Sequence, residues 1–207
     1  RCSDGSARIA SELGADVIEV DGGSKAKAQN AALAHVTTDL VLPLDDDSVL
    51  AQDYLEQILP IFEADRTHEV SVAAGKVLTR YDRTWTERAR MMEYLFNFHS
   101  LRPLQQATGS VTVAAGCCSV FRVGYLRESG GFPERTLCED IDYSLTQHRL
   151  RRRVEYCARA VCYAAEPDTV ALMRTQLRRW KHGWQQAVKA NLPGLLVRRQ
   201  RVAGWLI

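Results

Sequence analysis

The sequence contains no hydrophobic run long enough to cross a bilayer, no internal repeat and no low-complexity tract. A membrane-spanning helix needs about 20 consecutive apolar residues, so the 207 residues encode no complete one. Six cysteines are present, but none forms the C-x-x-C pairs of structural zinc sites, and a chain of this size needs no disulfide cross-links. We therefore expect reduced thiols that pack as small hydrophobic side chains.

An excess of one charge sign is also missing from the chain as a whole, which has 27 Lys and Arg against 25 Asp and Glu. This balance, with 46% hydrophobic residues, excludes a disordered chain and argues against a uniformly basic nucleic-acid binder. The charges are nevertheless segregated. Residues 1–148 have 14 basic and 22 acidic side chains, whereas residues 149–201 have 13 basic and 3 acidic ones. This division predicts two different roles along one chain.

The two ends of the sequence indicate a piece of a longer protein. The sequence begins at Arg1 without an initiator Met or a targeting signal. It ends in an apolar run, residues 202–207, directly after the basic stretch 198–201. A basic flank before apolar residues is typical of the cytoplasmic start of a membrane helix, which is our expectation. The alternative is a short terminal strand or helix that packs on the core.

Strand-like and helix-like segments alternate along the chain. The expected strands are residues 15–20, 39–44, 69–77, 111–121 and 154–165. The expected helices are residues 25–36, 53–64, 85–98, 140–150 and 169–190. This alternation predicts an α/β fold with a mostly parallel sheet covered by helices. Ligands of such sheets bind beyond the carboxyl ends of strands, and three aspartates follow the segment 39–44.

Those aspartates, Asp45, Asp46 and Asp47, are the strongest local signal. Three adjacent carboxylates repel one another, so a folded site that holds them needs a cation nearby. Hard ions such as Mg²⁺ take oxygen ligands, usually one or two carboxylates together with substrate phosphates. The alternative is a solvated acidic turn in which Asp47 or Ser48 caps the following helix.

Two further segments combine reactive side chains. Glu139 and Asp140 open an expected helix, where a carboxylate can act as a general base or simply stabilise the helix N-terminus. Gln176, Arg179 and Trp180 share one face of the last expected helix, with a planar donor for phosphate and an aromatic platform. That helix is basic and amphipathic, as suits a membrane interface; the alternative is ordinary packing on the core.

Taken in order, these residues resemble the family-two inverting glycosyltransferases, in particular the membrane-embedded branch of hyaluronan, chitin, cellulose and poly-N-acetylglucosamine synthases. The segments that carry the resemblance are Ser3 to Ser6, Ser24 to Asn30, Asp45 with Asp47, Ala115 to Arg122, Gly130 to Phe132, Leu137 to Asp140, Glu166 with Pro167, and Gln176 with Arg179 and Trp180. The match runs across nearly the whole chain. It implies a GT-A-like fold and transfer of a sugar from a nucleotide-sugar.

The resemblance also implies a role for each matching residue. Donor binding falls to Asp4, Lys25, Asp45 and Asp47, and Asp45 and Asp47 also hold Mg²⁺ or Mn²⁺. Asp140 is the implied catalytic base, with Glu139 beside it. The acceptor and its channel are lined by Gly116, Cys117, Gln176, Arg179 and Trp180.

Some positions depart from the family pattern. Ser3 and Ser24 replace an aspartate and a glycine of the nucleotide-binding segments, and Cys138 stands where threonine is usual. The resemblance therefore implies binding of a nucleotide-sugar more directly than it implies uridine as the base. The strand–helix–strand unit that opens the family domain is missing before Ser3.

The complete expectation is a catalytic domain over residues 1–168, a basic interfacial helix with its flank over 169–201, and the start of a membrane helix over 202–207. The enzyme is expected at the cell membrane with its catalytic domain facing the cytoplasm. There it adds sugars, processively and with inversion, from a donor expected to be a UDP-sugar to a growing β-linked glycan. The partners are thus donor, acceptor and membrane lipids, and no nucleic acid. The alternatives are a non-processive enzyme acting on a lipid, or a non-catalytic metal-binding module associated with membranes.

Overall fold

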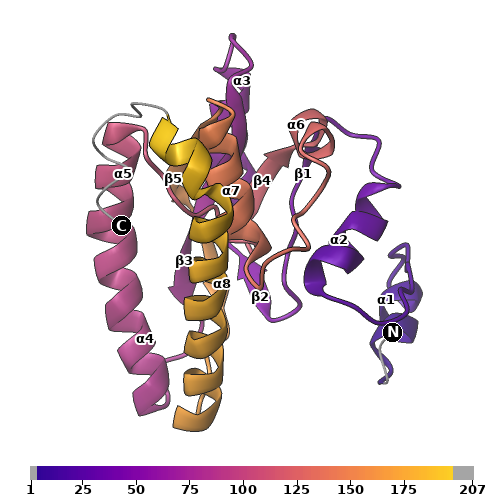
Figure 1. Cartoon of the computed structure of the whole chain (residues 1–207). Helices are drawn as coiled ribbons and strands as arrows, with labels where there is room; N and C mark the ends of the chain where they lie inside the picture. The colour runs from indigo at the N-terminus through magenta and orange to yellow at the C-terminus, as the bar shows by residue number, and fades with distance from the viewer. Residues whose placement is uncertain (1–3, 198–207) are drawn as a thin grey trace.

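The computed structural model describes residues 4–197, whose strands form one mixed five-stranded sheet with helices around it (Figure 1). In spatial order the strands are β1 (Leu40–Val41), β4 (Ser119–Arg122), β3 (Val70–Thr79), β5 (Arg153–Ala164) and β2 (Ser48–Leu50). Strands β3 and β5 form the long central pair and are parallel. The pairs β1–β4, β3–β4 and β2–β5 are antiparallel.

The α/β expectation is confirmed, but the sheet is not mostly parallel within the described residues. Alternation of helices and strands along a chain favours consecutive parallel strands. Here β1 and β2, which follow one another in sequence, instead add to opposite edges of the sheet, each antiparallel to its neighbour. The extended segment between them, residues 42–47, must therefore cross the ends of the central strands. Asp45 lies on this segment, where its backbone C=O accepts a hydrogen bond from Ser48 N at the start of β2.

Two of the expected strands are corrected by the structure. Residues 15–20 form no strand, and Val17 and Ile18 are both 41% exposed. An extended segment becomes a strand only when a neighbour pairs with its N–H and C=O groups, and no strand of the described chain lies beside this one. Residues 111–118 likewise form a loop before β4, which starts only at Ser119.

The expected helices all form, with shifted ends. They are α2 (Lys25–Leu33), α3 (Tyr54–Glu63), α4 (Trp85–Phe96), α7 (Glu139–Arg149) and α8 (Val170–Val197). Helix α4 continues through a π-helical turn (Asn97–Leu101) into α5 (Arg102–Thr108), and two short helices, α1 (Ser6–Glu12) and α6 (Val123–Glu128), were not expected. The main core lies between the sheet and these helices, and includes Ile58, Val72, Phe121 and Tyr143.

Helix α8 has one face packed against α7 and stands beside α4 (Figure 1). Cys138, Ile141, Leu145 and Ala187 form a small second core between α7 and α8. No helix within residues 4–197 combines the length and the apolar character needed to cross a membrane. The expected membrane-helix start at residues 202–207 lies outside the described residues.

Candidate functional site

Four ionisable side chains from three separate segments meet at the ends of the central strands. The Lys25 ammonium at the start of α2 forms a hydrogen-bonded ion pair with the Asp45 carboxylate. The same Nζ lies 3.7 Å from Oε1 of Glu139, the first residue of α7. Asp140 follows on that helical turn, where acidic side chains are stabilised by the helix dipole. The structure thus brings together residues that the sequence assigned separately to donor binding and to catalysis.

The Asp140 carboxylate is held in a fixed orientation by two backbone N–H groups. Gly116 donates to Oδ2 at 3.1 Å, and Ile141 donates to Oδ1 at 2.8 Å. A methyl group at position 116 would lie 3.2 Å from Oε1 of Glu139 and 3.6 Å from Nζ of Lys25. Gly116 therefore belongs to the wall of the carboxylate site, where a larger residue would crowd both charged groups.

The environment makes both carboxylates stronger bases. Burial raises the pKa of Asp140, although the hydrogen bonds from Gly116 and Ile141 counteract part of that effect. Burial and the adjacent Asp140 charge also raise the pKa of Glu139. Burial disfavours the ammonium of Lys25, but the hydrogen bond and charge of Asp45 outweigh it and raise the pKa of Lys25. The site therefore holds a permanent positive charge beside a carboxylate able to accept a proton.

The oxygen ligands of Asp45 and Asp47 fit a hard divalent cation. Asp47 is exposed, and its Oδ1 accepts a hydrogen bond from the Ser48 hydroxyl at 3.3 Å. Partial desolvation by its neighbours and the repulsion of Asp45 and Asp46 raise the pKa of Asp47, and a bound cation would relieve this repulsion. Because Asp45 is already paired with Lys25, Asp47 is the freer ligand for Mg²⁺ or Mn²⁺.

Asp4 is not brought to this group. Its carboxylate accepts a hydrogen bond from the backbone N of Ser6 at 3.1 Å, which opens α1. Helix α1 lies beyond α2, at the outer edge of the molecule (Figure 1). No hydrogen bond or ion pair within residues 4–197 joins Asp4 to Lys25 or Asp45. Its assignment to the donor stays a prediction.

The expected acceptor motif on α8 lies next to the start of α7. Helix α8 approaches closely at Gly183, where a methyl group would lie 2.7 Å from Cβ and 2.9 Å from N of Cys138. Trp180, one helical turn before Gly183, is half-buried and packs against the small second core that contains Cys138. Cys138 directly precedes Glu139 and Asp140, so the glycine sets the distance between the motif and these two carboxylates.

The other two members of the motif differ in exposure. Gln176 is half-buried, and its Oε1 has no hydrogen-bond partner among residues 4–197. Arg179 is exposed, yet its charge reaches Cys138. Burial raises the pKa of Cys138 to about 12, Asp140 and Glu139 add to the shift, and Arg179 opposes it. The guanidinium and the acidic pair therefore act on the same thiol, as expected for neighbours around one site.

A buried polar network behind Trp180 was missed by sequence reasoning. The Arg90 guanidinium of α4 lies 4.7 Å from the Trp180 ring centre. Its Nε donates to Oε2 of Glu166 at 3.1 Å, and the Tyr94 hydroxyl donates to Oε1 of Glu166 at 2.6 Å. The sequence shows Arg90 only as one charged residue in a helix with apolar residues around much of its circumference, and burial of the charge depends on Glu166, 76 residues later.

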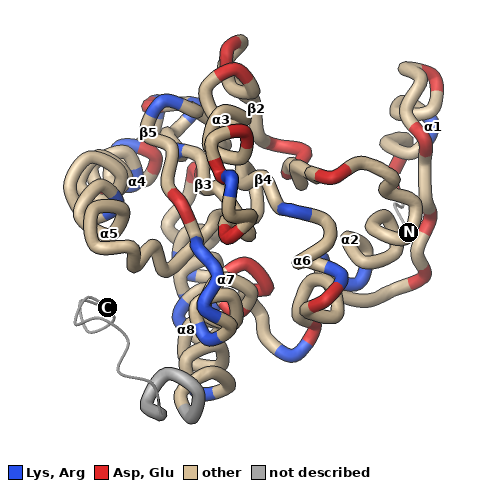
Figure 2. The backbone as a smooth tube through the Cα atoms, turned by 90° about the horizontal axis from the view of Figure 1, so that it is seen from above, with Lys and Arg blue, Asp and Glu red and all other residues tan. Residues whose placement is uncertain are grey.

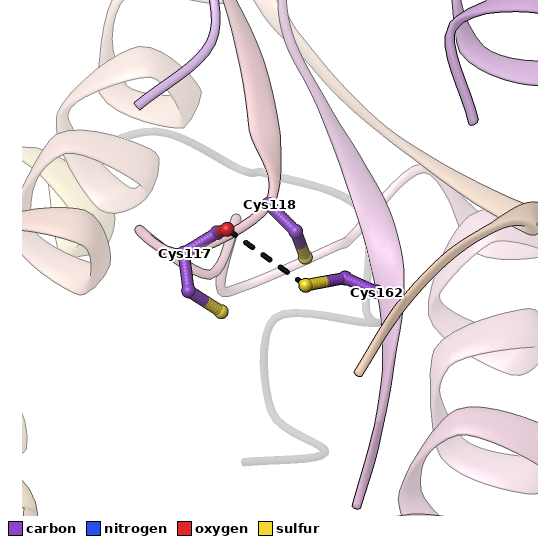
Figure 3. Close-up of side chains that lie close together, drawn as sticks. All are labelled: Cys117, Cys118 and Cys162. Carbon is purple, nitrogen blue, oxygen red and sulfur yellow. Dashed lines mark hydrogen bonds between the residues drawn. The ribbon is translucent and has the colours of Figure 1, made fainter. Parts of the chain in front are cut away.

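A cluster of three thiols also lies beside Gly116 and was not expected from the sequence. The sulfur atoms of Cys117, Cys118 and Cys162 are all within 4.8 Å of one another (Figure 3). Cys117 and Cys118 precede β4, whereas Cys162 is on β5, and the cysteines that the structure describes are all free. The adjacent pair at 117 and 118 was the one available signal, but its third partner depends on strand pairing.

A cavity of about 450 Å³ is lined by a glycine turn, residues 129–133, together with residues of α2 and α7. Asn30 of α2 fixes this turn, since Oδ1 accepts from Phe132 N at 2.7 Å and Nδ2 donates to Phe132 O at 3.0 Å. The cavity wall contains Gly130, Gly131, Glu134 and others, but none of the predicted carboxylates. The match of Asn30 and Phe132 to two family motifs thus corresponds to a direct contact.

Curated relatives of this chain include enzymes of polysaccharide synthesis. The chain is 23% identical over 171 residues to poly-beta-1,6-N-acetyl-D-glucosamine synthase of Staphylococcus epidermidis, covering 83% of this chain and 41% of the relative. It is 24% identical over 164 residues to the protein of the same name from Staphylococcus aureus, covering 79% and 39%. The chain therefore spans about two fifths of the length of these relatives.

Solved structures show the same fold at low sequence identity. The mannosyltransferase PcManGT from Pyrobaculum calidifontis, in complex with GDP-Man and Mn²⁺, matches 92% of this chain and 52% of its own, with a TM-score of 0.71 and 21% identity. S. aureus TarS 1-349 in complex with UDP-GlcNAc matches 97% and 57%, with a TM-score of 0.60 and 14% identity. These likenesses establish a GT-A-like glycosyltransferase fold.

The sequence family described as "Glycosyltransferase like family 2" matches residues 1–183, which include the Lys25–Asp45 pair, the acidic start of α7 and the motif on α8. The residues that this family matches, the fold of the chain and its curated relatives all point to the same family. The chain belongs to glycosyltransferase like family 2.

Proposed function

We propose that this chain is the catalytic part of an inverting glycosyltransferase that moves a sugar from a nucleotide-sugar to an acceptor hydroxyl. The observation that carries the proposal is the meeting of Lys25, Asp45, Glu139 and Asp140 beside Gly116. Lys25 supplies a positive charge for the donor phosphates, and Asp140, oriented by backbone hydrogen bonds, supplies a base in the same site. The GDP-Man and UDP-GlcNAc complexes of similarly folded proteins support a nucleotide-sugar as donor.

In the proposed reaction Asp140 removes the proton from the acceptor hydroxyl as its oxygen attacks the anomeric carbon. The bond from that carbon to the diphosphate oxygen breaks, so a single displacement inverts the configuration. Hydrogen bonds from Gly116 and Ile141 keep the base aimed in one direction, and Lys25 places positive charge near the departing diphosphate. Mg²⁺ or Mn²⁺, held by Asp47 with Asp45, supplies further charge neutralisation for the leaving group when bound.

We propose further that the complete protein works processively at the cytoplasmic face of the cell membrane and extends a β-linked glycan. Similarity to two poly-beta-1,6-N-acetyl-D-glucosamine synthases supports a polysaccharide product. The place of Trp180 beside the start of α7 supports an acceptor site there, with Gln176 and Arg179 on the same helix. A shallow surface groove on α8, lined by Val170, Met173, Arg174, Leu177, Arg178 and Lys181, supports contact with anionic lipid.

The test is a donor screen with the full-length protein in membranes, in which consumption of each nucleotide-sugar is followed with Mg²⁺ or Mn²⁺. We expect one donor to be consumed, with a β-linked product from an α-linked donor. Failure to turn over any nucleotide-sugar would contradict the proposed function. A product that stops at one sugar on a lipid would contradict processivity alone.

A further inference from the structure

The three thiols of Cys117, Cys118 and Cys162 form a preorganised cluster that the proposed reaction does not use. Cys162 lies on β5, where it pairs with Leu50 of β2 on one side and Val77 of β3 on the other. These contacts fix the backbone of Cys162 from both sides. The cluster (Figure 3) therefore has one thiol on a central strand and two at the end of the loop that leads into β4.

The backbone of Cys118 is fixed just as firmly. Its carbonyl oxygen accepts hydrogen bonds from the Tyr54 hydroxyl and from the backbone N of Gly75, the latter at 3.1 Å. Cys118 and Cys162 are fully buried, while Cys117 is half-buried and gives the cluster its access to solvent. Two ligands are thus held in place, and the third can adjust and admit an ion.

The spacing suits a single metal ion. Zinc–sulfur bonds are about 2.3 Å long, so three sulfurs around one Zn²⁺ lie about 3.8–4.0 Å apart. The present sulfurs, all within 4.8 Å of one another, need only a small contraction to reach that arrangement. Cys117 is the residue that moves, because its side chain is the least enclosed of the three.

The type of ligand selects the type of ion. Thiolates prefer soft or borderline cations such as Zn²⁺, whereas carboxylate oxygens prefer Mg²⁺ and Mn²⁺. The thiol cluster and the Asp45–Asp47 turn are therefore two sites for two different classes of ion. They are also close, because the charge of Asp45 acts on the thiols of Cys117 and Cys162.

We propose that Cys117, Cys118 and Cys162 bind one thiophilic divalent ion of the Zn²⁺ class, and that its binding inhibits sugar transfer. Cys117 adjoins Gly116, whose N–H orients the Asp140 carboxylate at 3.1 Å. Drawing the Cys117 sulfur toward an ion moves the Gly116 peptide and loosens that hydrogen bond. The inhibitory part rests on the proposed function, whereas the binding part does not.

Binding is tested on the reduced full-length protein, with thiols counted beforehand, by titration with Cd²⁺ as a spectroscopic substitute for Zn²⁺. We expect one tightly bound ion per chain, a thiolate-to-metal absorption band and release of protons, since thiols must deprotonate to bind. C118S and C162S should each weaken binding at least ~10-fold, since loss of even an outer-shell partner of a metal ligand costs that much. Near-ultraviolet circular dichroism of each variant verifies that the fold is kept.

The matched control is C157S. Cys157 is a free, half-buried cysteine on the same strand as Cys162, but its thiol donates to the Gln57 carbonyl at 3.2 Å and is outside the cluster. This variant should bind Cd²⁺ like the parent protein. Equal loss of binding in C157S, undiminished binding in C162S, or no binding by fully reduced protein would each overturn the metal site.

Inhibition is measured separately, with Zn²⁺ added to the active membrane enzyme at saturating Mg²⁺ or Mn²⁺. We expect loss of activity that a chelator reverses and that C162S resists, since this residue is outside the reaction machinery. Inhibition that persists in C162S would place the effect at the carboxylates and overturn the regulatory part. An enzyme inactive without Zn²⁺ would contradict the proposed function, while the Cd²⁺ titration would still decide the metal site.

Discussion

At the scale of single residues, the proposed chemistry depends on Asp140. Its two oxygens accept hydrogen bonds from Gly116 and Ile141, which Asn can imitate only in part, and Asn cannot accept the acceptor's proton. D140N should therefore lower kcat by about 10²–10⁴-fold, the usual contribution of a general base. The measurement is initial rate at saturating donor and acceptor, with donor affinity expected to change little.

The neighbouring carboxylate gives the control for that substitution. The Glu139 carboxylate faces Lys25, with Oε1 3.7 Å from Nζ, and so lies on the side of the site expected to hold the donor. E139Q should thus affect donor binding more than the chemical step. A smaller loss of kcat in D140N than in E139Q would mean that the base has been misassigned.

The raised pKa of Asp140 predicts the acid side of the pH–rate profile. Only the ionised carboxylate accepts a proton, so activity is lost as pH falls through the pKa of the folded protein. Because burial raises that pKa, the loss should begin at higher pH than for a solvent-exposed aspartate. The profile of kcat/KM should show this limb in the parent enzyme, and the residual activity of D140N should not follow it.

Arg90 is the clearest test of the network that sequence reasoning missed. Its guanidinium pairs with Glu166 where both side chains are almost fully buried, at 1% and 3% exposure. Removing one partner of a buried pair leaves an uncompensated charge and typically costs about 3–5 kcal/mol. R90M should therefore lower the free energy of unfolding by that order in chemical denaturation.

The control for R90M is E93Q. Glu93 also pairs with Arg90, but its side chain is 54% exposed, so its loss should change stability by less than about 1 kcal/mol. Similar effects from both variants would show that the burial of the Glu166 pair is not what matters. A second consequence of R90M should be lower acceptor affinity, because Trp180 loses the cation beside its ring.

At the scale of elements, the position of α8 depends on one glycine. A methyl group at Gly183 would lie 2.7 Å from Cβ of Cys138, closer than side chains can approach, and the obstacle is another element's backbone and Cβ. G183A should force the two helices apart and lower stability by about 1–3 kcal/mol, although alanine favours the helix itself. The melting temperature of G183A in thermal unfolding measures the loss of stability.

The same variant should also reduce activity, since the separation moves Trp180 away from the start of α7. Q185A is the matched control, because Gln185 is exposed on the same helix. It should leave both stability and activity nearly unchanged. An unaltered melting temperature for G183A would refute the tight contact.

The longer helices were predictable from local sequence, most of them from their pattern of apolar residues, whereas the short α1 and α6 were not. Residues 53–64, for example, form α3 with Ile58 and Phe62 buried, as their spacing indicated. Strand direction was not predictable in this way. The direction of β1 and β2 is set by distant partners, Phe121 for Val41 and Cys162 for Leu50, which no local pattern identifies.

The residues of the candidate site likewise divide into those that local sequence identifies and those that depend on distant partners. Lys25, Asp45 and Asp140 were found from ordered motifs, and the structure joins them through contacts of charged groups. The third thiol at Cys162 and the buried Arg90 were not found. Both are ordinary residues in sequence whose meaning comes from pairing across the sheet or between helices.

At the scale of the whole molecule, part of the basic segment of the sequence, residues 170–189, lies in one long, mostly exposed helix apart from the acidic site. The acidic site gathers Asp45 and Glu139 around Lys25, while α8 has Lys and Arg residues along its sequence, marked in blue on the backbone (Figure 2). On that helix Val170, Leu172 and Leu177 are also exposed, at 59%, 57% and 39%. Exposed apolar side chains among basic ones are typical of a helix that lies on an anionic membrane surface.

This arrangement predicts binding to lipid vesicles. Each basic residue near an anionic surface contributes about 1 kcal/mol, so replacing Arg174, Arg178 and Lys181 together with alanine should cost about 3 kcal/mol. That is a loss of roughly 10²-fold in partition coefficient, measured by co-sedimentation with vesicles of phosphatidylglycerol. Binding by the parent chain should also weaken as salt rises, because salt screens exposed charges. R66A is the control, since Arg66 is an exposed arginine on a different part of the surface, and equal losses in the two variants would disprove docking through α8.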